Sequence, residues 1–143
     1  MTPVLTEDAK RFVGMLTFEA LAGKRLPESL WSGDEPLSHT ALGKSADAVL
    51  IAPATATILA KAVAGVADDL LTAVLLSTAA PVVMVPAMHS EMWENLATQN
   101  NVEVLRTRGV TVMEPGWGEL AGFDEGPGRL PEVEDIVSLV ELV

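Results

Sequence analysis

The stretch "DAVLIAPATATILAKAVAGVADDLLTAVLLST", Asp47 to Thr78, decides the fold. It opens with a short apolar run, Asp47–Ala52, of the kind that forms a β-strand buried on both faces. Pro53 follows this run, and the remainder from Ala56 to Thr78 is helical in composition. A buried strand that leads directly into a helix predicts one unit of a parallel sheet.

Two further runs repeat this pattern. "PVVMV", Pro81–Val85, and "VTVME", Val110–Glu114, are short β-branched runs bounded by turn residues. The segment Thr98–Gly109 between them is helical in composition, with Thr98 as a plausible N-cap and Gly109 just after the helix end. The alternation of strands and helices predicts the α/β class, with a parallel sheet and right-handed crossovers.

The rest of the chain fits one domain over residues 1–143, although three strands make a thin sheet. The stretch 6–23 predicts a helix, a turn and a second helical piece. Gly116–Gly128 has five glycines and one proline in thirteen residues, so it is expected to be a loop, of a length typical of functional lids. The last helix is expected to begin at Pro131 and to turn four side chains inward. They are Val133, Ile136, Val137 and Val140.

The charge and residue composition of the chain limit the classes of partner it can bind. Nine Lys and Arg against twenty Asp and Glu give the 143 residues a formal net charge of −11. That charge argues against nucleic acid and anionic membranes, whereas backbone N–H groups still allow a phosphorylated ligand. The chain has no cysteine, and its His, Asp and Glu show no metal-ligand spacing, so no metal is expected. Without a membrane span or a visible signal peptide, a cytoplasmic protein is expected.

Ligands of open parallel sheets bind beyond the carboxyl ends of the strands. After the first strand, Thr55 and Thr57 set two hydroxyls beside a helix N-terminus. This arrangement suits an anion or a ring carbonyl. A plain N-cap threonine explains the same residues, and the pattern does not separate the two interpretations.

After the second strand, the motif "PAMHSEMW" carries His89, which is either a surface histidine or a group that binds a carboxylate or shuttles a proton. The apolar side chains of the motif either line a pocket or fill the core. They are Met88, Met92 and Trp93. His39 precedes the first strand, on a short helix. The pair Asp68-Asp69 is either catalytic, part of the solvated face at a helix C-terminus, or a cap for a neighbour.

Five blocks carry a resemblance to a known family. They are "TEDAKRFVGMLTFEALAG", "SHTALGKSADAVLIAPATAT", "AKAVAGVADDLL", "PAMHSEMWENLATQNNVEVLRTRGV" and "GELAGFDEGPGRLPE". In this order they resemble the flavin-dependent cysteine decarboxylases, which act on phosphopantothenoylcysteine in coenzyme A biosynthesis or on C-terminal cysteines of ribosomal peptides. The resemblance implies a Rossmann-like, flavodoxin-like three-layer sandwich, FMN as cofactor, and a homotrimer or a dodecamer of trimers.

The resemblance also implies roles for individual residues. His39 matches the catalytic histidine of the family. Met88, His89 and Met92 match the segment that binds the cysteinyl carboxylate, with His89 where asparagine is usual. Gly122 matches a flap position near the substrate that usually holds a cysteine. FMN contacts are implied for eight residues: Thr6, Ala9, Phe12, Pro53, Ala54, Thr55, Ala56 and Thr57.

The implied reaction is the oxidative decarboxylation of a cysteine carboxyl, with phosphopantothenoylcysteine and phosphopantetheine as the leading substrate and product. Hydride transfer from the thiol carbon to FMN gives a thioaldehyde, and its C=S bond accepts the charge that remains when CO₂ leaves. Because Gly122 replaces the cysteine of the final reduction, a peptidyl-cysteine decarboxylase that releases an enethiol is an alternative. The family's first strand and its glycine/serine-rich phosphate loop are not found before Leu5. A non-catalytic truncated or regulatory homologue is therefore a further alternative.

Overall fold

The computed structural model describes residues 1–31, 38–122 and 124–143, which form two compact units. The first unit comprises Met1–Ser45 and Val66–Ala79. The second comprises Ala46–Gly65 and Ala80–Val143, and it contains every strand of the described residues.

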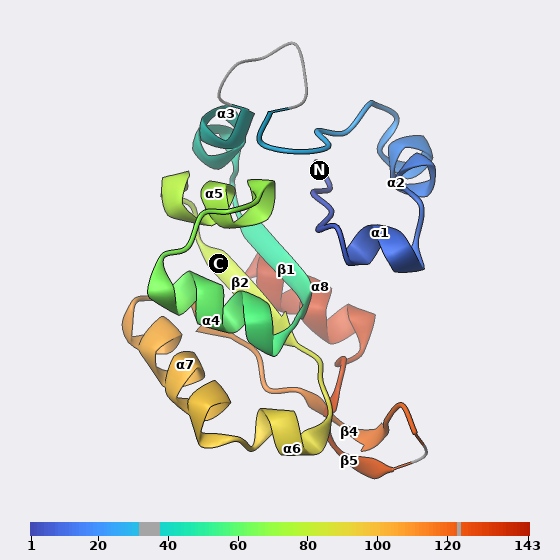
Figure 1. Ribbon diagram of the computed structural model, residues 1–143, viewed down its shortest axis with the longest axis vertical. Helices are drawn as coiled ribbons and strands as arrows, with labels where there is room; N and C mark the ends of the chain where they lie inside the picture. The colour runs from blue at the N-terminus through green and yellow to red at the C-terminus, as the bar shows by residue number, and fades with distance from the viewer. Residues whose placement is uncertain (32–37, 123) are drawn as a thin grey trace. The chain divides into compact units, whose positions relative to one another are not determined.

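The second unit is built on a parallel sheet of three strands in the order β1-β2-β3 (Figure 1). The strands are β1 (Val49–Ala54), β2 (Val82–Pro86) and β3 (Thr111–Val112). The three predicted strands are thus confirmed, with bounds shifted by one or two residues. Val83–Val85 of the central strand is buried on both faces, whereas Leu50 on β1 is exposed, so the expectation of full burial fails for β1.

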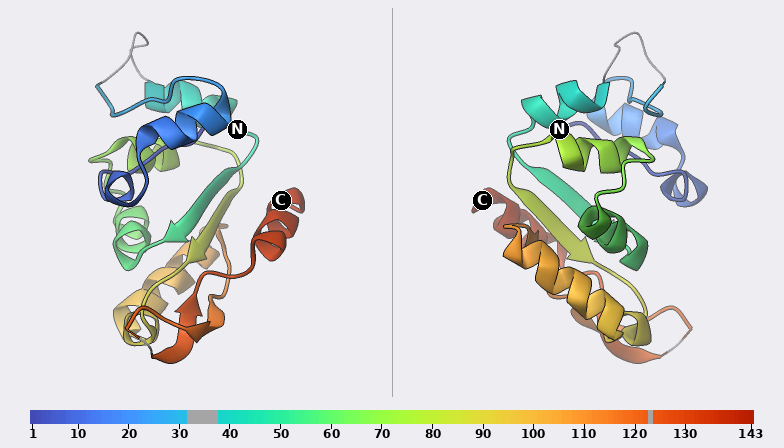
Figure 2. Two further views of the ribbon diagram at one scale, coloured as in Figure 1. Left: turned by 90° about the vertical axis from the view of Figure 1, so that its right-hand side faces the viewer. Right: turned by 60° about the vertical axis from the view of Figure 1, so that its left-hand side comes forward.

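Helices cover both faces of this sheet (Figure 2). α4 (Ala56–Ala64) and α7 (Leu96–Thr107) pack together on one face. On the other face, α8 (Val133–Glu141) buries Ile136 against Val83 and Val85 of β2. The unit is therefore an α/β three-layer sandwich, which confirms the predicted fold class.

The segment 56–78, helical in composition, forms two helices rather than one. α4 ends at Gly65, which caps it in the left-handed conformation with φ 70°, and α5 (Leu70–Ser77) begins only after Asp69. The Asp69 carboxylate accepts the backbone N–H of Thr72 at 2.8 Å, and the Thr72 hydroxyl reaches back to the Asp69 N–H. This reciprocal capping fixes the start of a new helix. The interpretation of Asp69 as a cap is confirmed, whereas a place at a helix C-terminus is wrong, because Asp69 lies at the N-terminus of α5.

Two helices begin at other residues than predicted. Asn95, not Thr98, caps α7, because its side chain accepts the N–H of Ala97 at 2.9 Å. Gly109 follows the end of this helix with φ 86°, as predicted. α8 begins at Val133 rather than at Pro131.

Only one side of α8 faces the sheet. Ile136 is buried and Val140 packs against the same cluster, as expected. Val133 and Val137 are 63% and 50% exposed, so the prediction that they point inward is wrong.

The predicted loop Gly116–Gly128 forms a β-hairpin instead, with Phe123 outside the described residues. β4 (Gly116–Glu119) pairs antiparallel with β5 (Glu125–Arg129). Its glycines allow close packing: a Cβ on Gly128 would overlap the Met88 carbonyl oxygen, and one on Gly126 would overlap the Ser90 hydroxyl. The glycine content thus reflects contact with the segment after β2 rather than an irregular loop.

The first unit contains α1 (Ala9–Phe12), α2 (Met15–Ala22), α3 (Ser38–Ser45) and α5, so the predicted pair of N-terminal helices is confirmed. α3 packs on α5, where the Thr78 hydroxyl donates to the Gly43 carbonyl at 2.9 Å. α1 and α2 have no buried residue.

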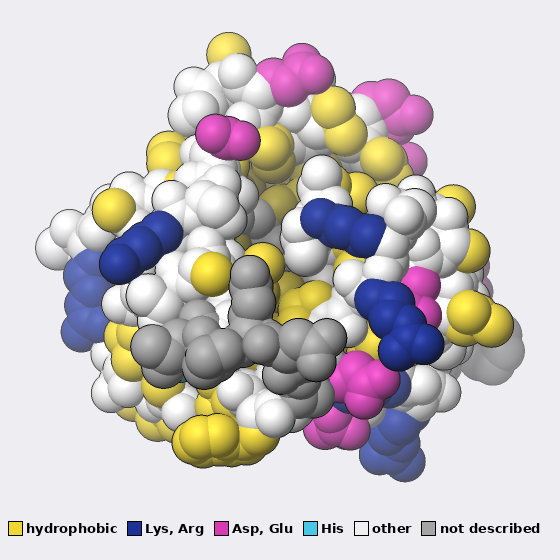
Figure 3. Space-filling model, turned by 90° about the horizontal axis from the view of Figure 1, so that it is seen from above, with side chains coloured by type: hydrophobic (Ala, Val, Ile, Leu, Met, Phe, Trp, Pro, Cys, Tyr) yellow, Lys and Arg dark blue, Asp and Glu magenta, His cyan; other side chains and the backbone are white. Residues whose placement is uncertain are grey.

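Hydrophobic side chains are exposed among Lys, Arg, Asp and Glu on the face drawn in Figure 3. In the described part of the chain, no helix is long and apolar enough to cross a membrane.

Candidate functional site

The carboxyl ends of β1 and β2 lie side by side, together with the residues that follow them. Ala54 pairs with Pro86, and the Ala87 N–H donates to the Ala54 carbonyl at 3.2 Å. The structure thereby brings the predicted segment Pro53–Thr57 next to Pro86–Trp93. The carboxyl edge of the sheet is where open parallel sheets bind ligands.

The β1–α4 segment offers small side chains and an open helix end. Ala54 is buried, whereas Pro53, Thr55 and Thr57 are exposed or partly exposed. The Thr55 hydroxyl accepts the Ile58 N–H at 3.3 Å, which confirms it as the N-cap of α4. Its own hydrogen remains able to donate, and the first-turn amides of a helix point out of its end. Short accessible side chains with donors beside them fit the polar edge of a flavin ring.

The segment after β2 is held by the hairpin. The Met88 N–H donates to the Gly128 carbonyl at 2.9 Å, and the Ser90 hydroxyl donates to the Pro127 carbonyl at 2.7 Å. His89 lies just before the short helix α6 (Ser90–Trp93). These two bonds, from residues on either side of His89, fix its position against β5.

The apolar side chains of this segment divide into two groups. Trp93 is only 6% exposed, so the interpretation of this residue as core filler is confirmed. Met88 is partly buried and Met92 is exposed, so both stay accessible at the carboxyl edge. Either thioether can contact an apolar part of a ligand there.

His89 is bracketed by two carboxylates. Its Nδ1 lies 2.5 Å from Glu91 Oε2, and its Nε2 lies 3.4 Å from Asp124 Oδ2. The hydrogen bond with Glu91 raises the pKa of His89 above its usual value, and the negative charges of Glu91 and Asp124 add to this effect. The same hydrogen bond lowers the pKa of Glu91. The arrangement therefore favours an imidazolium that can bind a carboxylate.

Gly122 lies in the turn that also carries Asp124. It has φ 101°, and a Cβ built on it would lie 4.0 Å from Asp124 Oδ2. A side chain at this φ is strained, which explains why glycine fits the turn. Through Asp124, the structure brings this turn to His89.

His39 belongs to the first unit, where it lies on α3 next to Ser38. Its backbone carbonyl accepts the Ser77 hydroxyl at 3.0 Å, which ties α3 to α5. The side-chain Nδ1 is buried and has no hydrogen-bond partner among the described residues. Buried polar atoms without a partner are rare in folded proteins, so this imidazole is suited to a bound group.

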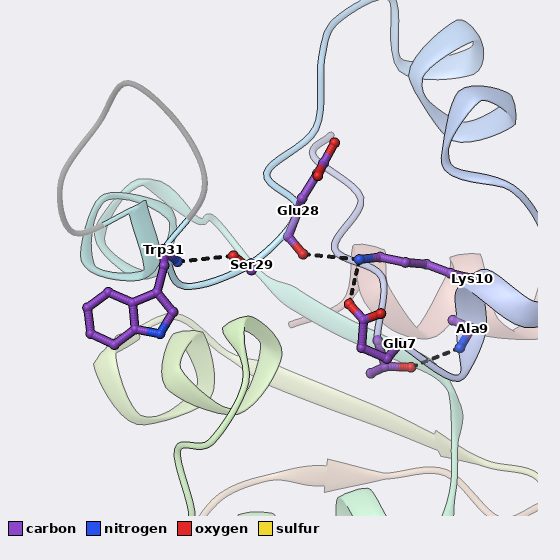
Figure 4. Close-up of polar contacts among 7 residues, drawn as sticks. Glu7, Ala9, Lys10, Glu28, Ser29 and Trp31 are labelled. Carbon is purple, nitrogen blue, oxygen red and sulfur yellow. Dashed lines mark hydrogen bonds and ion pairs between the residues drawn. The ribbon is translucent and has the colours of Figure 1, made fainter.

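A small acidic pocket of the first unit is lined in part by the N-terminal segment that carries Thr6. The pocket has a volume of about 160 Å³ and is lined by Leu5–Glu7, Glu28–Trp31 and Asp68–Leu71. Around it, Lys10 contacts the Glu7 carboxylate at 2.6 Å and the Glu28 carbonyl at 3.2 Å (Figure 4). It is smaller than the roughly 300 Å³ at which small-molecule sites begin.

The predicted Thr6, Ala9 and Phe12 do not converge on this pocket. Thr6 lines it and accepts the Ala9 N–H through its hydroxyl at 3.1 Å, as the start of α1. Phe12 is 89% exposed and does not line it. The predicted FMN contacts of these three residues stay a prediction.

Sequence reasoning missed Glu91 and Asp124, the two partners of His89. Glu91 follows the histidine by two residues, a spacing that could have been noticed. Asp124 comes from a hairpin turn far along the chain, and no local pattern indicates it. No cluster of His, Asp and Glu that could hold a metal ion occurs in residues 1–31, 38–122 and 124–143.

Comparisons with known proteins show the family of the chain. The model of the family described as "Flavoprotein" matches residues 2–142. The bifunctional coenzyme A biosynthesis protein CoaBC of Mycolicibacterium smegmatis is 54% identical over 140 residues, which cover 98% of this chain and 34% of that protein. The chain thus spans about a third of the length of the curated relatives it matches.

Two solved structures extend the comparison to the fold. SpaF, an FMN-dependent cysteine decarboxylase, has a TM-score of 0.82 at 36% identity, covering 99% of this chain and 77% of its own. A mutant PPC decarboxylase complexed with pantothenoylaminoethenethiol has a TM-score of 0.74 at 31% identity, covering 82% and 72%.

Proposed function

Because the chain belongs to the Flavoprotein family, we propose that residues 1–143 act as one FMN-dependent cysteine decarboxylase domain. The observation that carries this proposal is the junction of Pro53–Thr57 with Pro86–Trp93 at the carboxyl edge of the sheet. One segment offers a surface for a flavin, and the other offers an imidazolium for a carboxylate.

Phosphopantothenoylcysteine is the substrate we propose, with phosphopantetheine as the product. The similarity to the CoaBC protein, at 54% identity, supports a place in coenzyme A biosynthesis. The likeness to a PPC decarboxylase that holds pantothenoylaminoethenethiol supports the same substrate class.

The substrate carboxylate binds, in this proposal, at His89. The cation pairs with the carboxylate, while Met88 and Met92 contact the apolar part of the cysteinyl group. The hydrogen bonds of the neighbouring Met88 and Ser90 to β5 keep the imidazole in place. A fixed cation lowers the entropic cost of orienting the scissile carboxylate.

The cofactor lies, in this proposal, against Pro53, Ala54, Thr55, Ala56 and Thr57. When bound, FMN supplies the two-electron oxidation of the cysteinyl thiol, without which loss of CO₂ would leave an unstabilised carbanion. The Thr55 hydroxyl and the unpaired first-turn amides of α4 would donate hydrogen bonds to the flavin. Short side chains let the ring approach the backbone.

His39 takes the role of proton carrier in this proposal. Imidazole can accept a thiol proton at one nitrogen while it keeps the hydrogen on the other. The buried Nδ1 without a partner among the described residues supports a functional role for this side chain. The proposed contacts of Thr6, Ala9 and Phe12 belong to the same holoenzyme.

A second candidate function is favoured by Gly122. The glycine adopts φ 101°, a conformation that a cysteine would enter only with strain. Without a cysteine at this turn, the reaction would end at an enethiol, as in a peptidyl-cysteine decarboxylase.

We also propose a cytoplasmic homotrimer, alone or within a dodecamer of trimers. α1 and α2 have no buried residue, and Phe12, Leu16 and Leu21 are among their exposed side chains. Apolar helices of this kind are suited to contact between subunits.

Product analysis separates the candidates. The protein is saturated with FMN, its visible spectrum is recorded, and it is mixed with phosphopantothenoylcysteine or with a peptide that ends in cysteine. Loss of CO₂ alone from the first substrate supports the main proposal. Loss of CO₂ and two hydrogens from the peptide supports the second. His39→Asn should abolish either reaction and keep the flavin spectrum, while the control Lys44→Gln on the same helix should react normally. If no flavin absorbance stays with the protein after free FMN is removed, both functions are refuted.

A further inference from the structure

The contacts of His89 come from two different elements. Glu91 belongs to α6, next to the histidine in the chain, whereas Asp124 belongs to the turn between β4 and β5. The His89 side chain is 33% exposed, and the Asp124 side chain is 70% exposed. A carboxylate from the hairpin thus meets the imidazole at a solvent-accessible position.

The two contacts differ in strength. Glu91 Oε2 lies 2.5 Å from Nδ1, within the range of a charge-assisted hydrogen bond. Asp124 Oδ2 lies 3.4 Å from Nε2, which is longer than such bonds. Within the part of the chain that the structure describes, His89 is the only ion-pair partner of Asp124. Asp124 is therefore the more easily displaced of the two carboxylates.

The charges around His89 require Asp124 to leave when another carboxylate binds. One imidazolium and two carboxylates sum to a charge of −1, so a third carboxylate would enter a site that is already negative. If Asp124 moves away, the incoming carboxylate restores the original balance. Like charges within a few ångströms repel each other, so His89 does not hold all three at once.

We propose that Asp124 occupies the position at His89 Nε2 that the substrate carboxylate takes, and that it competes with the carboxylate for this cation. The inference rests on the proposed function, because it takes the segment after β2 as the carboxylate site. Asp124 then acts as a specificity-determining residue: a ligand without a carboxylate gains nothing by displacing it.

The competition has a consequence for turnover. The substrate bears a carboxylate and the decarboxylated product does not. Once CO₂ has left, the cation at Nε2 is free to pair with Asp124 again. The return of Asp124 therefore favours release of the product over rebinding.

The hairpin is built to permit this exchange. Its base is tethered by the bonds of Met88 to Gly128 and of Ser90 to Pro127. Asp124 lies at the opposite end of β5, and its side chain is mostly in solvent. A rotation of this side chain alone can break the contact of 3.4 Å, with no change in the pairing of β4 and β5.

The test compares two charge-neutralising variants on the hairpin. Asp124→Asn removes the competing charge, and Glu125→Gln removes an equal charge from the exposed neighbour. The probes are N-acetylcysteine, which has the carboxylate, and N-acetylcysteamine, which lacks it. Dissociation constants are measured by NMR from the His89 imidazole signals.

Removal of an exposed ionic competitor should tighten N-acetylcysteine binding by about 1.5- to 5-fold in Asp124→Asn. Binding of N-acetylcysteamine should not change, and Glu125→Gln should match the wild type with both probes. The inference alone is overturned if N-acetylcysteine perturbs His89 in the wild type but binds Asp124→Asn no more tightly, or binds both variants equally more tightly. If it perturbs His89 in none of the proteins, the inference and the proposed carboxylate site are both overturned.

Discussion

Replacement of Gly128 by alanine should detach the hairpin from the segment after β2. A Cβ at this position would overlap the carbonyl oxygen of Met88, a backbone atom that cannot rotate away as a side chain could. Gly128 also has φ 141°, which L side chains disfavour. Both effects act on the pair of hydrogen bonds that hold residues 88–90.

The size of the effect can be worked out from three contributions. Loss of the bond from the Met88 N–H to the Gly128 carbonyl, at 2.9 Å, costs about 1 kcal/mol. Loss of the bond from the Ser90 hydroxyl to the Pro127 carbonyl, at 2.7 Å, costs a similar amount, about 1 kcal/mol. Backbone strain adds about 1 kcal/mol. Gly128→Ala should therefore lower the free energy of unfolding by about 3 kcal/mol.

Urea denaturation measures this change, and hydrogen exchange of the Met88 amide locates it. The matched control is Gly116→Ala on the partner strand, where the nearest atom to a new Cβ is a carbonyl oxygen at 3.5 Å. The control should stay within about 0.5 kcal/mol of the wild type. If Gly128→Ala is as stable as the control and the Met88 amide remains as protected, the close packing of the hairpin is refuted.

Three further predictions concern single contacts. Thr55→Ala should lower the free energy of unfolding by about 1 kcal/mol through loss of the N-cap, and Thr55→Ser should restore it; equal urea midpoints for all three proteins would contradict the cap. Gly43→Ala would set a Cβ 2.6 Å from the Ser77 hydroxyl oxygen and 3.0 Å from the Ser77 carbonyl carbon, so it should cost about 1–3 kcal/mol in thermal unfolding; an unchanged melting temperature would speak against this packing. Glu91→Gln should lower the pKa of His89 toward 6.5, as measured by NMR titration, because the Glu91 hydrogen bond is the largest cause of its rise. Because the pKa of His89 is raised in the folded state, protonated His89 stabilises the folded protein fully below pH 6.5, and this stabilisation is lost as the pH rises through the folded pKa. Glu91→Gln should therefore flatten the pH dependence of the free energy of unfolding in that window. An unmoved pKa would rule out the Glu91 hydrogen bond as the cause.

The sheet and the two segments at its edge could be predicted because their signals are local. Apolar β-branched runs such as Val82–Val85 mark strands by themselves, and a parallel sheet then places the segment after each strand at its carboxyl edge. For this reason Pro53–Thr57 and Pro86–Trp93 could be chosen as ligand segments before their contact was known.

The break between α4 and α5 was harder to predict, because Val66–Asp68 is compatible with a helix by composition. The deciding features are the left-handed Gly65 and the reciprocal cap of Asp69 with Thr72. Each residue is tolerated inside a helix, and only their combination ends one helix and starts another.

The hairpin was predicted to be a loop because glycine is found both where the backbone is irregular and where two backbones pack closely. Glycine content is usually read as conformational freedom, whereas Gly126 and Gly128 are needed so that β5 can approach Ser90 and Met88. The approach depends on a tertiary contact that the sequence does not display. The partnership of His89 with Asp124 was missed for the same reason.

The most direct test of the central claim is release of labelled CO₂ from phosphopantothenoylcysteine that carries ¹³C in its cysteinyl carboxyl group. The protein is first saturated with FMN, and His89→Ala treated in the same way serves as the comparison. We predict that the wild type releases ¹³CO₂ in repeated turnovers and that the variant releases far less. If the FMN-saturated wild type releases no ¹³CO₂ from this substrate or from a peptide ending in labelled cysteine, the assignment as a cysteine decarboxylase is wrong.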